Sequence, residues 1–214
     1  RYQTEPNSTA CELCPADSFS NDTNMTRCLP CASGESTYTR EGAASCEKCQ
    51  AGKYGDNCAN CPAGFVRGSN SNSAAKCDEC LPGYSQKLAG QAACLPCVPG
   101  KFQSKFNSTS CKACAEGTFQ RLANGTTCEI CPEGYYQAES SAPLCFPCFP
   151  GKTQSVRGQR SCEKCADGKY QSEAGQTTCD TPDKMRVAVD GVAAIKIPPG
   201  FGAAGCNSDR SICT

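Results

Sequence analysis

Apolar side chains are sparse along this chain, and the most regular ones are single aromatic residues at nearly constant intervals. Between them lie polar stretches. In the segment from Gly168 to Cys179, residues 169–172 are typical of a short strand, 173–175 of a turn and 176–179 of a return strand. The pattern predicts a miniature β-hairpin in every repeat, with its aromatic residue on the inner face. These aromatic residues are Phe19, Tyr54, Phe65, Tyr84, Phe102, Phe119, Tyr136 and Tyr170.

Cysteine pairs of the form Cys-x-x-Cys set the period of these hairpins. From Cys77 to Cys179 a pair or single cysteine opens a unit every 17 residues, whereas a short and then a long interval flank Cys58. The two departures place an irregularity, interpreted as a bend, at residues 50–76. The ten pairs begin at Cys11, Cys28, Cys46, Cys58, Cys77, Cys94, Cys111, Cys128, Cys145 and Cys162.

Glycine and glutamine recur at fixed places in the repeat. A glycine stands three residues after the second cysteine in every unit except the first, which has Asp17. This recurrence predicts a positive φ or a close backbone contact. A glutamine follows three residues later in Gln103, Gln120, Gln137, Gln154 and Gln171.

The position four residues before the next cysteine is occupied by glycine or asparagine. These two residue types share tolerance of the left-handed region, so the position predicts the hairpin turn. The residues are Gly42, Gly90, Gly158 and Gly175, and Asn7, Asn24, Asn107 and Asn124.

The repeat stops after Cys179, and a more apolar segment follows. Residues 185–197 carry β-branched residues on both sides of Asp190-Gly191, which is a strong hairpin signal. This hairpin could begin a further domain, dock on the last repeat or add to a neighbouring subunit's sheet. Simple edge packing is favoured.

Composition shows that covalent cross-links must replace a hydrophobic core. Of 214 residues, 23 are cysteine, while Leu, Ile, Val and Phe together number only 25. Such a cysteine content is typical of a secreted disulfide scaffold. A lone two-stranded hairpin is marginal in water, so each one needs a cross-link.

Charge and residue types exclude several classes of function. The 21 basic and 21 acidic residues cancel, so no single-sign field favours nucleic acid. Histidine is absent, which excludes Ser-His and Cys-His nucleophiles. Acids such as Glu133 and Asp167 are interpreted as solvated surface groups. We therefore expect a protein that is not an enzyme, with no catalytic residues, no cofactor and no metal site.

Three chemistries compete for the cysteines. Zinc would suit paired Cys-x-x-Cys motifs, and a dithiol redox site would suit a single one. Five N-glycosylation sequons argue for the secretory pathway and against zinc, and ten copies in succession argue against a redox site. The sequons are at Asn7, Asn21, Asn24, Asn107 and Asn124, four of them at the expected turn, and N-linked glycans are expected there. Structural disulfides are the favoured interpretation.

Pairing the second cysteine of each motif with the first of the next would close every hairpin at its base. An alternative joins first to first and second to second within two-repeat modules, for example Cys11–Cys28 and Cys14–Cys31. The first rule gives Cys14–Cys28, Cys31–Cys46, Cys49–Cys58, Cys61–Cys77, Cys80–Cys94, Cys97–Cys111, Cys114–Cys128, Cys131–Cys145, Cys148–Cys162 and Cys165–Cys179.

Three cysteines fall outside this rule. Cys206 and Cys213 are expected to pair locally in a small loop. Cys11 is unpaired within the chain and is expected to bond to a cysteine upstream of residue 1. The chain opens with Arg1 and has no signal peptide, so we interpret it as a processed or excised part of a larger secreted polypeptide. No apolar run approaches the 18 residues of a membrane helix, so no membrane insertion is expected within these residues.

The motif Cys-Pro-x-Gly-x-aromatic, followed after about ten residues by Cys-x-x-Cys, resembles the ephrin-receptor-like cysteine-rich repeat. It occurs as Cys131-Pro-Glu-Gly-Tyr-Tyr and Cys61-Pro-Ala-Gly-Phe. The chain is also similar to the first small module of tumour-necrosis-factor-receptor repeats, in which one disulfide closes the corresponding loop. The resemblance covers residues 11–179 and implies an elongated extracellular rod. It carries over no ligand-contact residues.

These observations predict a small, disulfide-rich, mostly β protein: a rod of about ten hairpin units. Residues 1–10 form a lead-in, residues 11–179 the repeats and residues 180–214 a terminal hairpin with a small disulfide loop. The favoured function is a structural extracellular glycoprotein within a filament, flagellar appendage, wall or matrix. Its partners would be copies of itself or other extracellular proteins. The alternative is a ligand-binding receptor ectodomain, for which residues 50–76 are the candidate patch.

Overall fold

The computed structural model describes residues 2, 11–22, 26–69, 76–183 and 186–196. The chain divides into two compact units, Arg1–Cys97 with Gln103–Cys111 and Val98–Phe102 with Lys112–Thr214. The described part of both units is made of β-hairpins and turns, without an α-helix.

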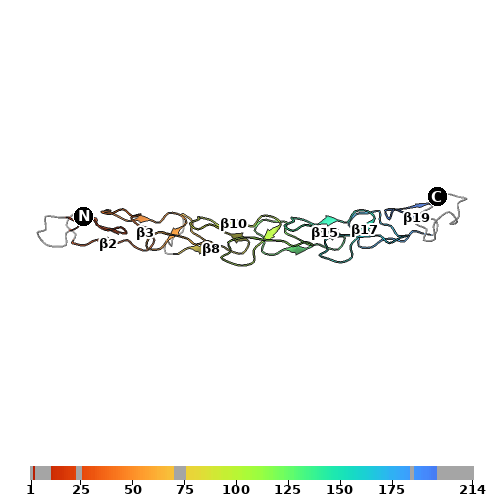
Figure 1. The fold of residues 1–214 in the computed structure, drawn as a ribbon, viewed down its shortest axis with the longest axis horizontal. Helices are drawn as coiled ribbons and strands as arrows, with labels where there is room; N and C mark the ends of the chain where they lie inside the picture. The colour runs from red at the N-terminus through yellow and green to blue at the C-terminus, as the bar shows by residue number, and fades with distance from the viewer. Residues whose placement is uncertain (1, 3–10, 23–25, 70–75, 184–185, 197–214) are drawn as a thin grey trace. The chain divides into compact units, whose positions relative to one another are not determined.

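Ten antiparallel hairpins make up the secondary structure, and nine of them have strands of only two residues (Figure 1). Within the repeats, β1 (Ser18–Phe19) pairs with β2 (Leu29–Pro30), β3 (Glu35–Ser36) with β4 (Glu47–Lys48), β5 (Lys53–Tyr54) with β6 (Ala59–Asn60), β7 (Phe65–Val66) with β8 (Asp78–Glu79), β9 (Tyr84–Ser85) with β10 (Leu95–Pro96), β11 (Lys101–Phe102) with β12 (Lys112–Ala113), β13 (Thr118–Phe119) with β14 (Glu129–Ile130), β15 (Tyr135–Tyr136) with β16 (Phe146–Pro147), and β17 (Lys152–Thr153) with β18 (Glu163–Lys164). The tenth hairpin is β19 (Arg186–Val189) with β20 (Ala193–Lys196).

Ten disulfides close the repeats, and they join the pairs that closing each hairpin at its base requires. The pairing into two-repeat modules does not occur, and Cys11 is free. We number the repeats by these bonds. Repeats 1 to 10 are closed in order by Cys14–Cys28, Cys31–Cys46, Cys49–Cys58, Cys61–Cys77, Cys80–Cys94, Cys97–Cys111, Cys114–Cys128, Cys131–Cys145, Cys148–Cys162 and Cys165–Cys179.

The return strand is displaced from its expected place. It was expected before the closing cysteine, at 176–179 of repeat 10, but in repeats 1 to 9 it consists of the two residues after that cysteine. In repeat 10 a single bridge joins Tyr170 to Asp180. The residues before the cysteine are not free for the ladder, because a side chain inside the loop binds the last of their carbonyls, for example that of Thr178.

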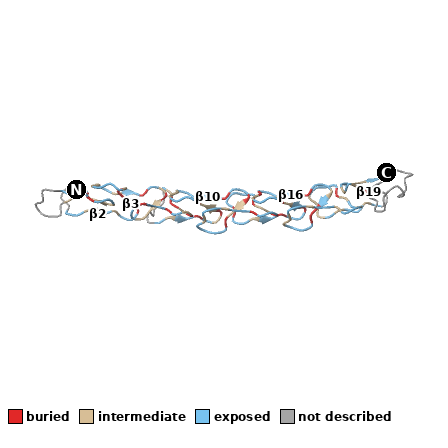
Figure 2. Cartoon of the chain, in the orientation of Figure 1, coloured by how far each residue is buried: buried red, intermediate tan, exposed pale blue. Residues whose placement is uncertain are grey.

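In repeats 5 to 9 the most buried side chains are a cysteine and a glutamine rather than an aromatic residue. Seven second cysteines are at most 1% exposed, among them Cys114 and Cys148. The recurring glutamines are 3–8% exposed, whereas aromatic residues such as Phe119 and Tyr136 are only half-buried. The expectation of an aromatic on the inner face is therefore wrong in part. Figure 2 shows the buried residues as short segments that recur along the chain.

The Asp190-Gly191 hairpin is confirmed, and it docks on the last repeats. Both turn residues have positive φ, 51° and 70°. Val187 and Ala188 of β19 are buried, and the Gln171 N–H donates to the Gly191 carbonyl at 2.8 Å. Of the three roles considered for this hairpin, docking on the repeats is the one that the contacts show.

Candidate functional site

Six buried glutamines hold the loops of repeats 5 to 10 from within. In repeat 8, Gln137 Nε2 donates to the Leu144 carbonyl at 2.7 Å, and its Oε1 accepts the Glu139 N–H at 2.9 Å. One side chain thus ties the start of the loop to the residue before the closing cysteine. We call this arrangement the glutamine clamp. It is formed by Gln86, Gln103, Gln120, Gln137, Gln154 and Gln171.

Glutamine suits this position because its amide is a donor and an acceptor at once. Burial leaves the loop's peptide groups without water, and an unsatisfied buried group costs about 1–3 kcal/mol. The sequence revealed five of the six glutamines as a recurrence. It did not reveal that they lie inside the loop.

The backbone of the same glutamine joins three repeats in sequence. The carbonyl of Gln154 accepts the Gly134 N–H from repeat 8 at 2.7 Å. Its N–H donates to the Gln176 carbonyl of repeat 10 at 3.1 Å. Gln86, Gln120, Gln137 and Gln154 all make both backbone bonds, so each of these four organises its own loop and connects it to the repeats before and after.

A second contact reaches two repeats along the chain. The tip residue, which stands four residues before the closing cysteine, has a positive φ in Gly175, Asn107 and Ser141 alike. Its carbonyl lies over the glycine of the repeat two earlier: a Cβ on Gly134 would stand 2.0 Å from the Gly175 oxygen. We call this contact the glycine socket. Its members are Gly52 with Gly90, Gly64 with Asn107, Gly100 with Ser141, Gly117 with Gly158 and Gly134 with Gly175.

Both expectations for this glycine are confirmed, because it has a positive φ and also a close backbone contact. Its φ ranges from 74° to 88° in repeats 2 to 10. The tip turn is likewise left-handed at each described position that was expected, and Ser141 takes this conformation without being glycine or asparagine.

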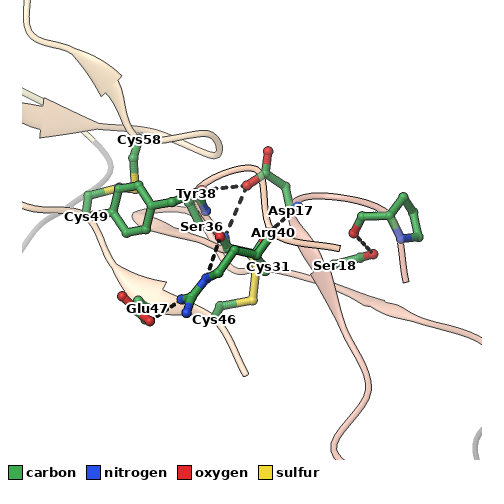
Figure 3. The surroundings of a disulfide bond; sticks show 12 residues. Asp17, Ser18, Cys31, Ser36, Tyr38, Arg40, Cys46, Glu47, Cys49 and Cys58 are labelled. Atoms are coloured by element: carbon green, nitrogen blue, oxygen red, sulfur yellow. Dashed lines mark hydrogen bonds and ion pairs between the residues drawn. A yellow bond between two sulfur atoms is a disulfide. The ribbon is translucent and has the colours of Figure 1, made fainter. Parts of the chain in front are cut away.

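Repeat 1 replaces the glycine with Asp17, which compensates through its side chain (Figure 3). Asp17 has a φ of 59°, and its carboxylate accepts the Ser36 hydroxyl at 2.6 Å and the Thr37 N–H at 3.3 Å. The Asp17 N–H donates to the Thr37 Oγ1 at 2.8 Å. A side-chain network thus substitutes for the backbone bond that the glycines make. Nearby, Arg40 pairs with Glu47 at the surface.

Repeat 4 has an arginine where repeats 5 to 10 have glutamine. Arg67 is 3% exposed, and its guanidinium donates to the carbonyls of Cys49 and Gln50 in repeat 3 at 3.0–3.3 Å. Its Nε is buried without a hydrogen-bond partner. Instead of clamping its own loop, this side chain fastens repeat 4 to repeat 3.

The irregular stretch 50–76, considered as a ligand patch, is largely occupied with internal contacts. Its buried cation, Arg67, is bound to backbone carbonyls. The Asn60 side chain lies against Gly90, 3.1 Å from where a Cβ on that glycine would stand. Lys53 lies 5.9 Å from the centre of the Tyr38 ring. Residues 70–75, which include the whole of the polar segment Asn70-Ser-Asn-Ser73, lie outside the described residues.

Three of the five sequons lie within the described residues. Asn21, Asn107 and Asn124 are exposed, and Asn107 and Asn124 are tip residues with φ of 55° and 54°. Asn7 and Asn24 lie outside the described residues, as do Cys206 and Cys213. Attachment of glycans and the pairing of Cys206 with Cys213 stay predictions.

At the N-terminal end, a hydrogen bond makes the Tyr2 phenol less acidic. The Tyr2 hydroxyl donates to the Glu12 carboxylate at 3.1 Å. This hydrogen bond and the negative charge of Glu12 raise the pKa of the Tyr2 phenol above its usual 10.0. Cys11 beside Glu12 is an exposed free thiol, and its expected bond to an upstream cysteine stays a prediction.

In the described ranges, no three His, Cys, Asp or Glu side chains gather in a way that could hold a metal ion. Across those ranges there is also no helix of the length and apolarity that a membrane crossing needs. Glu133 and Asp167 are exposed.

Comparison with known proteins identifies the type of repeat. Residues 83–124, from the glycine of repeat 5 to the tip of repeat 7, match the family model "Tyrosine-protein kinase ephrin type A/B receptor-like". Within residues 83–124 the chain carries ephrin-receptor-like cysteine-rich repeats. No curated protein matches the chain. The repeat family and the disulfides together indicate an extracellular or cell-surface, disulfide-rich module.

Proposed function

We propose that this chain is a non-enzymatic structural segment of an extracellular glycoprotein, a rod within a filament, flagellar appendage, wall or matrix. The observation that carries the proposal is the use of the recurring residues. Cysteine, glycine and glutamine recur because each is used in a bond inside a repeat or between repeats. None of the three is left facing solvent as a shared ligand-binding group.

The contacts between repeats favour an extended chain. Glutamine backbones connect a repeat to the next one, and glycine sockets connect it to the one after that, as in Gly100 with Ser141. Arrays in which each repeat contacts only its near neighbours grow in one dimension. If each repeat adds about 13 Å, the span of four extended residues, ten repeats would extend over roughly 100–150 Å.

Small-angle X-ray scattering of the glycosylated chain tests the shape. A maximum dimension above about 100 Å, with the cross-section of a thin rod, is expected. A radius of gyration near 17 Å, that of a compact globule of this length, would refute an extended segment.

A receptor ectodomain is the second candidate, and the irregular repeats 1 to 4 favour it. Electron microscopy of native material distinguishes the two. Long fibres carrying this chain at a regular spacing support the structural role. Isolated molecules distributed singly over a membrane, with a soluble ligand retained by repeats 1 to 4, support the receptor.

Glycosylation is tested separately by glycopeptide mass spectrometry of native material. Asn107 and Asn124 occupy equivalent tips of consecutive repeats, so both are expected to carry glycans one repeat apart. Finding all five sequons unmodified would contradict a secreted glycoprotein.

A further inference from the structure

Among the described residues, the glycine of the last repeat lacks the hydrogen bond that the N–H of the other repeat glycines makes. From Gly34 to Gly151, the N–H of each repeat glycine donates to a carbonyl of the following repeat. Gly168 of repeat 10 has the same conformation, with a φ of 77°, yet its N–H makes no hydrogen bond to a described residue. An N–H held in this orientation is a preformed binding point for an oxygen acceptor.

The terminal hairpin explains why the Gly168 N–H lacks this bond among the described residues. Its turn takes the place of an eleventh tip: Gln171 donates to Gly191 just as Gln154 donates to Gln176. In the repeats, the carbonyl that accepts the glycine N–H belongs to the residue four positions before the tip residue. The equivalent residue here is Arg186, which pairs with Lys196 in the ladder of β19 and β20. Among the described residues no hydrogen bond joins the Gly168 N–H to the Arg186 carbonyl, so the hairpin supplies the tip contact without this bond.

A cavity of about 400 Å³ lies between the last two repeats and the turn of the terminal hairpin. Gly168 lines it, together with residues of β17, β18 and the Asp190-Gly191 turn. All of these residues belong to one compact unit. The volume is within the range of small-ligand sites and is large enough for a few residues of extended peptide.

Three lysines give the cavity an excess of positive charge. Lys152 and Lys164 stand directly opposite each other in β17 and β18, and Lys169 lines the cavity beside Gly168. No other described repeat hairpin pairs two like charges across its strands, an arrangement that is unfavourable without an anion nearby. None of the three makes an ion pair with a described residue. Two aspartates also line the cavity, so three cations less two anions leave a formal charge of +1.

We propose that this cavity binds an acidic polypeptide segment in an extended conformation. A backbone carbonyl of the segment accepts the Gly168 N–H, and its Asp or Glu side chains pair with Lys152, Lys164 and Lys169. A peptide is favoured over other anions because the equivalent glycines from Gly34 to Gly151 each bind a peptide carbonyl. This site does not depend on the structural role proposed above.

The test uses the full chain labelled with ¹⁵N and the peptide acetyl-Gly-Glu-Gln-Glu-Gly-amide as probe. Titration is expected to shift the Gly168 amide resonance, and the shift should weaken as salt is raised. The double variant Lys152→Gln/Lys164→Gln is expected to bind at least about tenfold more weakly. Lys101→Gln is the matched control, because Lys101 has the same place in repeat 6 but faces Ala113 and does not line the cavity.

Three results would overturn the proposal. These are an unshifted Gly168 amide, equal binding of the neutral peptide in which both Glu are Gln, and tighter binding of an oligouronate or of sulfate than of the acidic peptide. Disulfide mapping and circular dichroism establish that the double variant is folded. A charge-reversed variant, Lys152→Glu/Lys164→Glu, should in addition gain binding of the peptide acetyl-Gly-Lys-Gln-Lys-Gly-amide; if it does not, the lysines do not contact the segment.

Discussion

Repeats 5 to 10 and repeats 1 to 4 carry different side chains at the clamp position but keep the same backbone bonds between repeats. The clamp position holds glutamine in all of the later repeats, but Ser20, Thr37, Gly55 and Arg67 in the earlier ones. The backbone bonds nevertheless persist: the Arg67 carbonyl accepts the Gly52 N–H, and the Arg67 N–H donates to Gln91. The connection between repeats therefore depends on the backbone, while each disulfide closes its own repeat, and the side chain at the clamp position can vary.

The largest effect of a single substitution is expected at a socket glycine. In Gly117→Ala the new Cβ would stand 1.9 Å from the Gly158 oxygen, so repeats 7 and 9 must separate. A left-handed alanine costs ~1–3 kcal/mol and a forced overlap ~1–3 kcal/mol more. We expect a loss of about 2–6 kcal/mol, measured by hydrogen exchange of the flanking amides.

Gly55→Ala in repeat 3 is the matched control for that variant. Gly55 has a similar φ of 75°, but a Cβ there meets no atom within 4 Å. Only the conformational cost of about 1–2 kcal/mol should remain. Equal losses of stability at the two glycines would show that the socket contact contributes nothing beyond the conformational cost of a positive φ.

Removal of a disulfide should lower the free energy of unfolding by a similar amount in repeats 1 to 4 and in repeats 5 to 10. Replacing Cys114 and Cys128 by Ala opens a loop of sequence separation 14, and replacing Cys49 and Cys58 opens one of separation 9. Loop entropy depends only on the logarithm of length, so each loss should be about 2–5 kcal/mol. Differential scanning calorimetry measures it. A difference of more than about 2 kcal/mol between the two pairs would show that the clamp and the disulfide are not independent.

Loss of one clamp is expected to cost less stability than loss of a disulfide, and its effect should be confined to its own loop. Gln137→Ala leaves the Leu144 carbonyl and the Glu139 N–H without their partner, at a cost of about 1–3 kcal/mol. Faster exchange of the Glu139 amide measures the opening. Gln159→Ala is the control, because its side chain is exposed and makes one long bond to Arg157. Unchanged exchange at Glu139 would contradict the clamp.

The smallest effect is expected when repeat 4 is given the clamp residue of the later repeats. Arg67→Gln loses the bonds to Cys49 and Gln50 but can form a clamp and removes the buried Nε that lacks a partner. These contributions oppose each other, so thermal unfolding should change by no more than about 1 kcal/mol. Arg40→Gln, at an exposed ion pair, serves as reference. A loss above about 3 kcal/mol would mean that Arg67 has a role that glutamine cannot supply.

The repeat, its turns and its cross-links were predictable because they depend on residues with few alternatives. Glycine and asparagine at one phase specify a left-handed tip, and Asp190-Gly191 specifies a hairpin. The place of the return strand and of Gln137 was not predictable, because a polar side chain is ordinarily assigned to the surface. Here small loops exclude water from their own peptide groups, and glutamine is needed inside. The socket of Gly134 with Gly175 joins residues 41 positions apart, which no local pattern reveals.

The disulfides also determine which part of the chain would carry tension. If the two ends were pulled apart, force would pass across each sulfur–sulfur bond and along the short Cys-x-x-Cys link, by-passing the loop. In repeat 7 the bond spans a Cα–Cα distance of 5.7 Å, and the three steps to Cys131 add about 10 Å. Once reduced, the same 17-residue step could lengthen to about 58 Å. Oxidation thus makes the covalent contour nearly inextensible, and a reductant would lengthen it more than threefold without cutting the backbone.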